Sequence, residues 1–112
     1  MEKNRKDITL YKLKFEVISK LDFSVSTTYV YWKVITTVKH PTLKSQEKSV
    51  KLTISDPDEI RLSKRDHMVF LFYRKIKKRY LCVVVKQLNE RGFIVTAYWT
   101  DKIKEGEVKW KK

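Results

Sequence analysis

The sequence has few of the residues on which many enzyme sites depend. Its 112 residues include only two glycines, two histidines and one cysteine. Gly92 and Gly106 are too few for the glycine-rich loops that hold nucleotide phosphates. Cys82 alone excludes an internal disulfide, and together with His40 and His67 it lacks the spacing of a zinc site. We therefore expect neither a metal nor another cofactor.

Long apolar segments are also absent. The longest runs, Met68–Tyr73 and Tyr80–Val85, are far shorter than the roughly 20 residues that a membrane-spanning helix requires. Residues 1–12 carry charges but no apolar core of the kind that a signal peptide has. We therefore expect a cytoplasmic protein that does not enter a membrane.

Positive charge is what the sequence has in excess. Lysine and arginine number 26 against 13 aspartates and glutamates, which gives a formal charge of +13 and a pI of about 9.9. A basic domain of this kind most often binds a polyanion, so we predict a nucleic-acid partner, and RNA before DNA. The length and a hydrophobic content of 42% predict one domain over residues 1–112, with 1–7 and 107–112 flexible.

The spacing of apolar residues predicts an α+β domain. Alternation over Leu10–Ser19 predicts a strand, and Asp22–Thr28 is polar enough for a connection. Thr28–Lys39 and Leu43–Ser55 have helical spacing, although the β-branched residues of the first leave a strand as the alternative, and Pro41 separates the two. Four strands are then predicted over Glu59–Ser63, Met68–Arg74, Tyr80–Leu88 and Phe93–Thr100. The expected fold is an N-terminal strand and two helices packed on one face of a four-stranded antiparallel meander.

A turn at Asn89–Gly92 predicts a hairpin and the faces of its strands. Asn at the first position and Gly at the fourth are typical of a type I turn with a glycine bulge. Pairing Asn89 with Phe93 places Lys86 opposite Thr96. The other face is almost entirely apolar and should contact the helices: Leu81, Val83, Val85, Val95, Ala97 and Trp99.

A second predicted hairpin turns through Lys75–Arg79. If Arg74 pairs with Tyr80, then Phe70 and Phe72 join Lys86 on the outer face, but one residue of slip would reverse this assignment. The outer face would then carry rings beside cations and hydroxyls: Phe70, Phe72, Arg74, Lys86, Thr96, Tyr98 and Thr100. Such a surface suits single-stranded RNA, because bases stack on rings while cations meet phosphates. The alternative is a second hydrophobic layer, covered by the N-terminal strand or by a partner chain.

The tip of this hairpin has five cations in the six residues Arg74–Arg79. We predict that its cations contact phosphates, the alternative being a solvated loop. The predicted nucleic-acid-binding residues are Arg61, Phe70, Phe72, Lys75, Lys77, Lys78 and Arg79. His40, before Pro41 at a helix end, suits general acid or base work, or is a surface residue that the helix dipole favours.

The order of strand, two helices and meander resembles the compact nuclease fold shared by barnase, EndoU, colicin tRNases and RelE. The strings KHPTLKSQEKSVKLTISDPDEI, LFYRK, YLCVVVK and GFIVTAYWTD are similar to small phage- and toxin-associated members, over residues about 28 to 106. The most specific pieces are the His40-Pro41 step, the segment Pro57–Ile60 and the segment Thr96–Tyr98.

The resemblance implies a toxin-like or phage-associated ribonuclease that acts without metal. A base directs the RNA 2′-hydroxyl at its phosphate, cations stabilise the phosphorane, and an acid protonates the leaving oxygen. His40 would be base or acid, Arg74 and Lys86 would stabilise charge, and Thr96 and Tyr98 would bind phosphate. A small acidic antitoxin or immunity protein would be the protein partner. The alternatives are a non-catalytic RNA- or DNA-binding module, and an interaction protein whose charge serves solubility.

Overall fold

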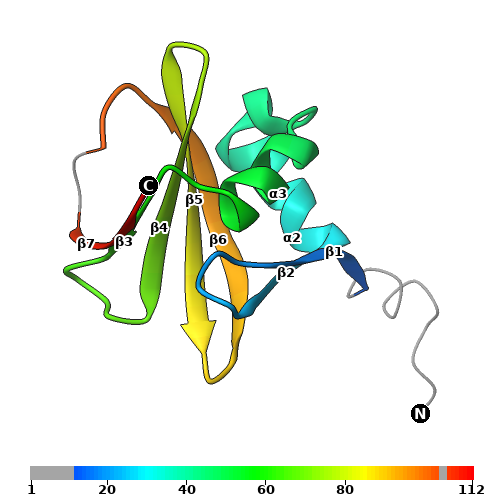
Figure 1. The fold of residues 1–112 in the computed structure, drawn as a ribbon. Coiled ribbons are helices and arrows are strands. Elements are labelled where there is room, and N and C mark those ends of the chain that lie inside the picture. The colour runs from blue at the N-terminus through cyan, green and yellow to red at the C-terminus, as the bar shows by residue number, and fades with distance from the viewer. Residues whose placement is uncertain (1–11, 104–105) are drawn as a thin grey trace.

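One mixed sheet of seven strands forms the centre of the computed structural model, which describes residues 12–103 and 106–112 (Figure 1). The strands are β1 (Leu13–Ile18), β2 (Ser24–Thr28), β3 (Glu59–Leu62), β4 (Val69–Ile76), β5 (Arg79–Leu88), β6 (Arg91–Thr100) and β7 (Glu107–Lys111). Between β2 and β3 lie the helix α2 (Tyr29–Val34), the π-helix η1 (Ile35–Lys39), the 3₁₀ turn η2 (Pro41–Leu43) and the helix α3 (Glu47–Ser55). The predicted α+β class is confirmed.

The sheet is larger than the four-stranded meander we predicted. Its order is β1-β2-β6-β5-β4-β3-β7, and every described neighbour pair is antiparallel except β2 and β6, which are parallel. The strands β3 to β6 are antiparallel neighbours in its middle, whereas β1, β2 and β7 extend it at the edges. The N-terminal strand β1 therefore pairs with β2 at one edge and does not pack on a face of the sheet.

Two of the additional strands come from segments that we predicted as irregular. The segment Asp22–Thr28, expected to be a polar connection, contains β2, in which Val25 and Thr27 are buried while the intervening residues are half-exposed. The alternation is therefore present, but its inward positions include only one apolar residue. At the C-terminus, residues 107–112, expected to be flexible, contain β7, which pairs with β3. The predicted flexible residues 1–7 lie outside the described residues.

The helices begin and end for local reasons. The hydroxyl of Thr28 accepts a hydrogen bond from the Tyr31 N–H at 3.1 Å, which caps the first turn of α2. The helical segment ends at Lys39, two residues before Pro41, as predicted. The second helix starts later than predicted, at Glu47, because residues 41–43 form the 3₁₀ turn.

Helices α2 and α3 lie on the same side of the sheet, which we call the inner face (Figure 1). The core there joins strand residues such as Val83 and Phe72 to helix residues such as Ile35 and Ile54, all four fully buried. On the outer face a smaller cluster forms around Leu71, Tyr73 and Cys82, and Ile103 from the segment between β6 and β7 packs against it. The outer face is therefore partly a second hydrophobic layer.

The β5–β6 hairpin has a shorter loop than predicted. Leu88 pairs with Arg91, so the loop is only two residues, and Asn89 adopts a positive φ of 60°. Lys86 consequently faces Phe93 and not Thr96. A register shift between Val84 and Val85 accommodates one extra residue of β6. Lys86 nevertheless lies on the outer face as predicted, because the neighbouring core residue Val85 points inward.

The β4–β5 hairpin is shifted by one residue from the prediction. Arg74 pairs with Leu81 and not with Tyr80. The slip reverses the faces of β4, so Phe70 and Phe72 point toward the inner face, where Phe72 is fully buried and Phe70 is half-buried. Both rings pack against Phe23, with centroid distances of 5.7 and 6.4 Å. Their predicted position on the outer face, on which their role in nucleic-acid binding depended, is therefore wrong.

Candidate nucleic-acid interface

Four cations, Lys75, Lys77, Lys78 and Arg79, surround the β4–β5 turn and form what we call the basic tip. All four are exposed, as predicted. Arg79 makes an ion pair with Asp101 at 3.2 Å, and Lys75 lies over the ring of Tyr80. Within the described part of the chain, Lys77 and Lys78 take part in no ion pair. Their charges are therefore available to an external anion.

A hollow with a volume of about 490 Å³ lies beside the basic tip. We call it the tip groove; it is lined by Thr42, Ile76, Lys77, Lys78, Arg79 and Trp99. Trp99 and Ile76 are half-buried and pack against the inner core, so they are held in place. The groove thus combines an indole and an aliphatic wall with exposed cations, the combination that single-stranded nucleic acids use for stacking and phosphate contacts.

A second feature runs along the edge of β6 that β2 does not cover. Only Arg91–Phe93 of β6 pairs with β2, and beyond this point α2 and η1 lie beside the strand (Figure 1). The hydroxyl of Tyr31 donates to the Val95 carbonyl at 2.6 Å, and the Lys39 ammonium donates to the same carbonyl at 3.3 Å. We call this edge of β6, from Val95 to Tyr98, the seam.

His40 lies at the end of the seam nearest the tip groove. Its backbone N–H closes the π-helix by donating to the Ile35 carbonyl at 2.7 Å. The half-buried imidazole lies against the ring of Tyr98, with 6.1 Å between the ring centroids. The structure therefore brings together two of the five predicted catalytic residues, an imidazole and a phenol, both of which can exchange protons.

The other three predicted catalytic residues do not complete a site around His40 and Tyr98. Arg74 points toward the inner face, where its guanidinium donates to the carbonyl and the carboxylate of Asp56, the latter at 3.1 Å. Lys86 is seven residues from the tip along β5, which is roughly 23 Å at 3.3 Å per residue. The hydroxyl of Thr96 is buried and has no hydrogen-bond partner among the described residues. These five residues do not form one catalytic cluster.

Arg61 also lies away from the basic tip. Its guanidinium forms an ion pair with Glu59 at 2.6 Å and donates to the Gly106 carbonyl at 3.2 Å. Both contacts lie where β3 meets β7, so Arg61 connects the last strand to the sheet. Its charge is satisfied within the protein.

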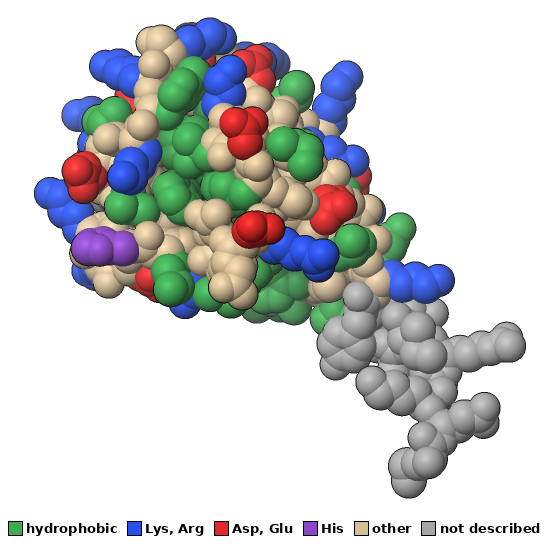
Figure 2. All heavy atoms as spheres, turned by 60° about the horizontal axis from the view of Figure 1, so that its bottom comes forward, with side chains coloured by type: hydrophobic (Ala, Val, Ile, Leu, Met, Phe, Trp, Pro, Cys, Tyr) green, Lys and Arg blue, Asp and Glu red, His purple; other side chains and the backbone are tan. Residues whose placement is uncertain are grey.

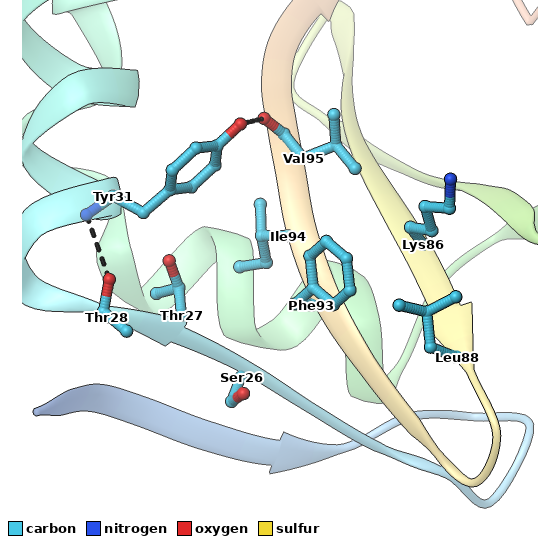
Figure 3. Close-up of a pocket in the computed structure, with 9 residues that line it drawn as sticks. All are labelled: Ser26, Thr27, Thr28, Tyr31, Lys86, Leu88, Phe93, Ile94 and Val95. Carbon is cyan, nitrogen blue, oxygen red and sulfur yellow. Dashed lines mark hydrogen bonds between the residues drawn. The ribbon is translucent and has the colours of Figure 1, made fainter. Parts of the chain in front are cut away.

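A larger hollow lies at the other end of the seam, where β2 and β6 separate (Figure 3). Its volume is about 640 Å³, and we call it the divergence pocket. Its lining comes from β2, α2, β5 and β6: Ser26, Thr27, Thr28, Tyr31, Lys86, Leu88, Phe93, Ile94 and Val95. Of these residues, only Lys86 was predicted as a site residue. The others could not be predicted, because the segment that forms β2 was expected to be a polar connection.

One ion pair orients the cation at this pocket. The Lys86 ammonium lies 3.2 Å from the carboxylate of Asp66. The backbone N–H of Met68, at 2.9 Å, and the Lys86 ammonium hold the pKa of Asp66 below its ordinary value. Asp66 therefore stays ionised at neutral pH and positions Lys86. Figure 2, which brings the β5–β6 turn end forward, shows hydrophobic side chains among basic and acidic ones; Met68, Leu88 and Phe93 are exposed.

Among residues 12–103 and 106–112, no three His, Cys, Asp or Glu side chains gather as a metal site would require. Within the same ranges, no helix has the length and apolar character needed to span a membrane. Comparisons of the chain with protein-family models, with curated proteins and with solved structures give no match.

Proposed function

We propose that this protein is a cytoplasmic RNA-binding domain that holds single-stranded RNA at the basic tip and the tip groove. The observation that carries the proposal is the position of Lys77 and Lys78 beside Trp99 in one groove. Exposed ammonium groups contact phosphates, and an indole face offers stacking to any base. RNA is favoured over duplex DNA because a base must be unstacked to reach such a ring.

A metal-independent ribonuclease is the second candidate. His40 beside Tyr98 favours it, because transphosphorylation needs one group to take a proton and another to give one. The resemblance to the barnase and RelE nucleases adds to this candidate. Binding ranks first because the predicted stabilising cations Arg74 and Lys86 each hold a carboxylate elsewhere in the fold. An acidic antitoxin or immunity protein would compete with RNA for the basic tip.

The salt dependence of RNA binding tests the first proposal. The affinity for a labelled single-stranded RNA is measured by fluorescence anisotropy over a series of KCl concentrations. Each phosphate contact contributes a slope of about 0.7 to the dependence of log affinity on log salt for single strands. Lys77→Gln with Lys78→Gln should therefore lower the slope by about 1.4 and weaken binding.

A matched double variant controls for the loss of net charge. Lys109 and Lys111 are exposed on the edge strand β7, and Lys109→Gln with Lys111→Gln removes the same two charges. This control should keep the parental slope. Equal losses in both double variants would contradict a specific role of the tip. A parent without salt-dependent RNA affinity would overturn the proposed function.

A further inference from the structure

The divergence pocket exists because β2 and β6 follow different paths after a short parallel ladder. Their pairing ends at Ser26 and Phe93, after which β2 leads into α2 while an extra residue lengthens β6. Tyr31 spans the opening, and its hydroxyl bond to the Val95 carbonyl fixes its ring. The remaining volume of about 640 Å³ is within the roughly 300–1,000 Å³ that small-molecule sites occupy.

An unsatisfied hydroxyl lines this pocket. Thr27 is only 4% exposed, and its Oγ1 has no hydrogen-bond partner in the described structure. Buried polar atoms are nearly always hydrogen-bonded, because an unpaired one has lost its bonds to water without replacing them. Figure 3 shows the Thr27 hydroxyl on the pocket side of β2, between Tyr31 and Ile94. A ligand with a hydrogen-bonding edge would satisfy it.

The walls suit a planar ligand with an anionic substituent. Tyr31 and Phe93 lie on the two sides of Ile94 in Figure 3, and 40% of Phe93 is exposed. Lys86 places an ammonium at the pocket. A purely aliphatic ligand would leave the Thr27 hydroxyl unsatisfied. An added peptide strand would compete for the Val95 carbonyl, which already accepts from Tyr31 and Lys39.

We propose that the divergence pocket binds one unpaired nucleobase of an RNA strand, with Thr27 bonding the base edge and Phe93 stacking on the base. This inference rests on the RNA binding proposed above. The seam supports it, because Lys39 and His40 lie along β6 between the tip groove and the pocket. A strand that follows the seam can place one base in the tip groove and another in the pocket. A free nucleotide carries the same base and phosphate, so the test must separate the two sources.

The experiment uses single-stranded RNAs that each carry one 2-aminopurine, moved along the sequence. At one position we expect its fluorescence to change on binding, because the base enters a pocket with aromatic walls. Phe93→Ala should abolish this change and weaken binding by about 5- to 100-fold, the equivalent of a lost stacking contact. Thr27→Val should weaken binding by about 3- to 10-fold, the equivalent of one hydrogen bond.

Two matched control variants distinguish a lost ligand contact from a loss of folding. Thr53→Val also removes a buried hydroxyl, but Thr53 lies in α3 and does not line the pocket, so it should leave RNA affinity unchanged. Met68→Ala shortens an exposed apolar side chain outside the lining and should do the same. Thr27→Val should unfold at a higher denaturant concentration than the parent, because it removes a buried hydroxyl that has no partner among the described residues. Weakened binding by Thr27→Val together with parental binding by Thr53→Val supports the proposal.

The outcomes separate this inference from the proposed function. If the Lys77 and Lys78 double variant loses RNA affinity while Phe93→Ala and Thr27→Val keep it, the pocket is not a base site and RNA binding stands. If the parent binds no RNA, both proposals are overturned. AMP is titrated in parallel by NMR. Perturbed Thr27 and Phe93 signals with AMP, without any 2-aminopurine response, would overturn the RNA strand as the source of the base.

Discussion

Individual cations of this protein differ in how available they are to a ligand. Arg61, Arg74 and Lys86 each lie within 3.2 Å of a carboxylate of the same chain. Lys77 and Lys78 have no such partner among the described residues and are exposed. A phosphate that approaches a paired cation must compete with an anion already in place. Lys77 and Lys78 of the basic tip can therefore bind a phosphate without displacing a carboxylate of the same chain.

His40 is the residue on which the ribonuclease candidate depends. Removing a general acid or base commonly lowers a rate by roughly a hundred- to ten-thousand-fold. We predict that His40→Ala lowers RNA cleavage in EDTA by this factor and leaves RNA affinity nearly unchanged. Thermal unfolding of the same variant should stay close to the parent, because the imidazole is only half-buried.

The other histidine supplies the control for this prediction. His67 is exposed in the β3–β4 loop, and His67→Ala should cleave as the parent does. Parental cleavage by His40→Ala would make His40 a structural residue at the end of η1. A parent that cleaves no RNA in EDTA would remove the ribonuclease candidate and leave the binding domain.

Among the secondary-structure elements, β2 and β6 approach each other closely where they pair. Gly92 pairs with Val25 at this junction, and a Cβ built on it would lie 2.7 Å from a ring carbon of Phe23 and 2.9 Å from a methyl of Val85. Both neighbours belong to the core, so neither has much room to move. The junction that shapes the divergence pocket therefore requires glycine for its size.

We predict that Gly92→Ala destabilises the protein by about 1–3 kcal/mol, the usual cost of overpacking a core. Denaturant unfolding followed by circular dichroism measures the change. Asn89→Gly, in the adjacent turn, is the control, because Asn89 has a φ of 60° that glycine adopts without strain. It should be neutral or slightly stabilising. Parental stability of Gly92→Ala would show that the junction is loosely packed.

The helix α3 is tied to β1 by charge as well as by its apolar face. The carboxylate of Glu47 lies 2.9 Å from the Lys51 ammonium of its own helix and 3.0 Å from the Lys14 ammonium of β1. The hydrogen bond from Lys51 first, and then that from Lys14, holds the pKa of Glu47 below its ordinary value of 4.5 against the opposing effect of partial burial. A lowered pKa in the folded state means that ionised Glu47 favours folding.

This stabilisation is fully present above pH 4.5 and is lost as the pH falls through the lowered pKa. We predict that Glu47→Gln destabilises the protein slightly at neutral pH and makes its stability less dependent on pH below 4.5. The effect should stay below about 1 kcal/mol, because the pair is partly exposed. Denaturant midpoints measured at several pH values test it. Parallel pH profiles for variant and parent would contradict it.

For the molecule as a whole, one strand pair connects the two hollows. The tip groove lies at the start of β5 and the end of β6, and the divergence pocket lies at the other end of the same two strands. The seam follows β6 between them (Figure 1). A net charge of +13 attracts a polyanion from a distance, whereas these two hollows offer the short-range contacts. Both properties fit the RNA strand that we propose as the ligand.

Local sequence determined the position of most elements and the exposure of the basic tip. Runs of β-branched residues predicted β3 to β6, and helical spacing together with Pro41 predicted the helices. Five cations in six residues predicted an exposed β4–β5 turn, because burying them would be costly. Each of these depends on the preferences of neighbouring residues and on the cost of burying charge, which are readable along the chain.

The faces of β4, the parallel pairing of β2 with β6 and the divergence pocket were decided by the tertiary structure alone. A two-residue loop and a one-residue slip turned Phe70 and Phe72 into the core, because side chains alternate with a period of two and β4 is apolar on both faces. The pocket residues come from four separate elements, which the β2–β6 and β5–β6 pairings and the hydrogen bond of Tyr31 to Val95 bring together. No spacing in the sequence encodes that contact, since it joins residues 64 positions apart.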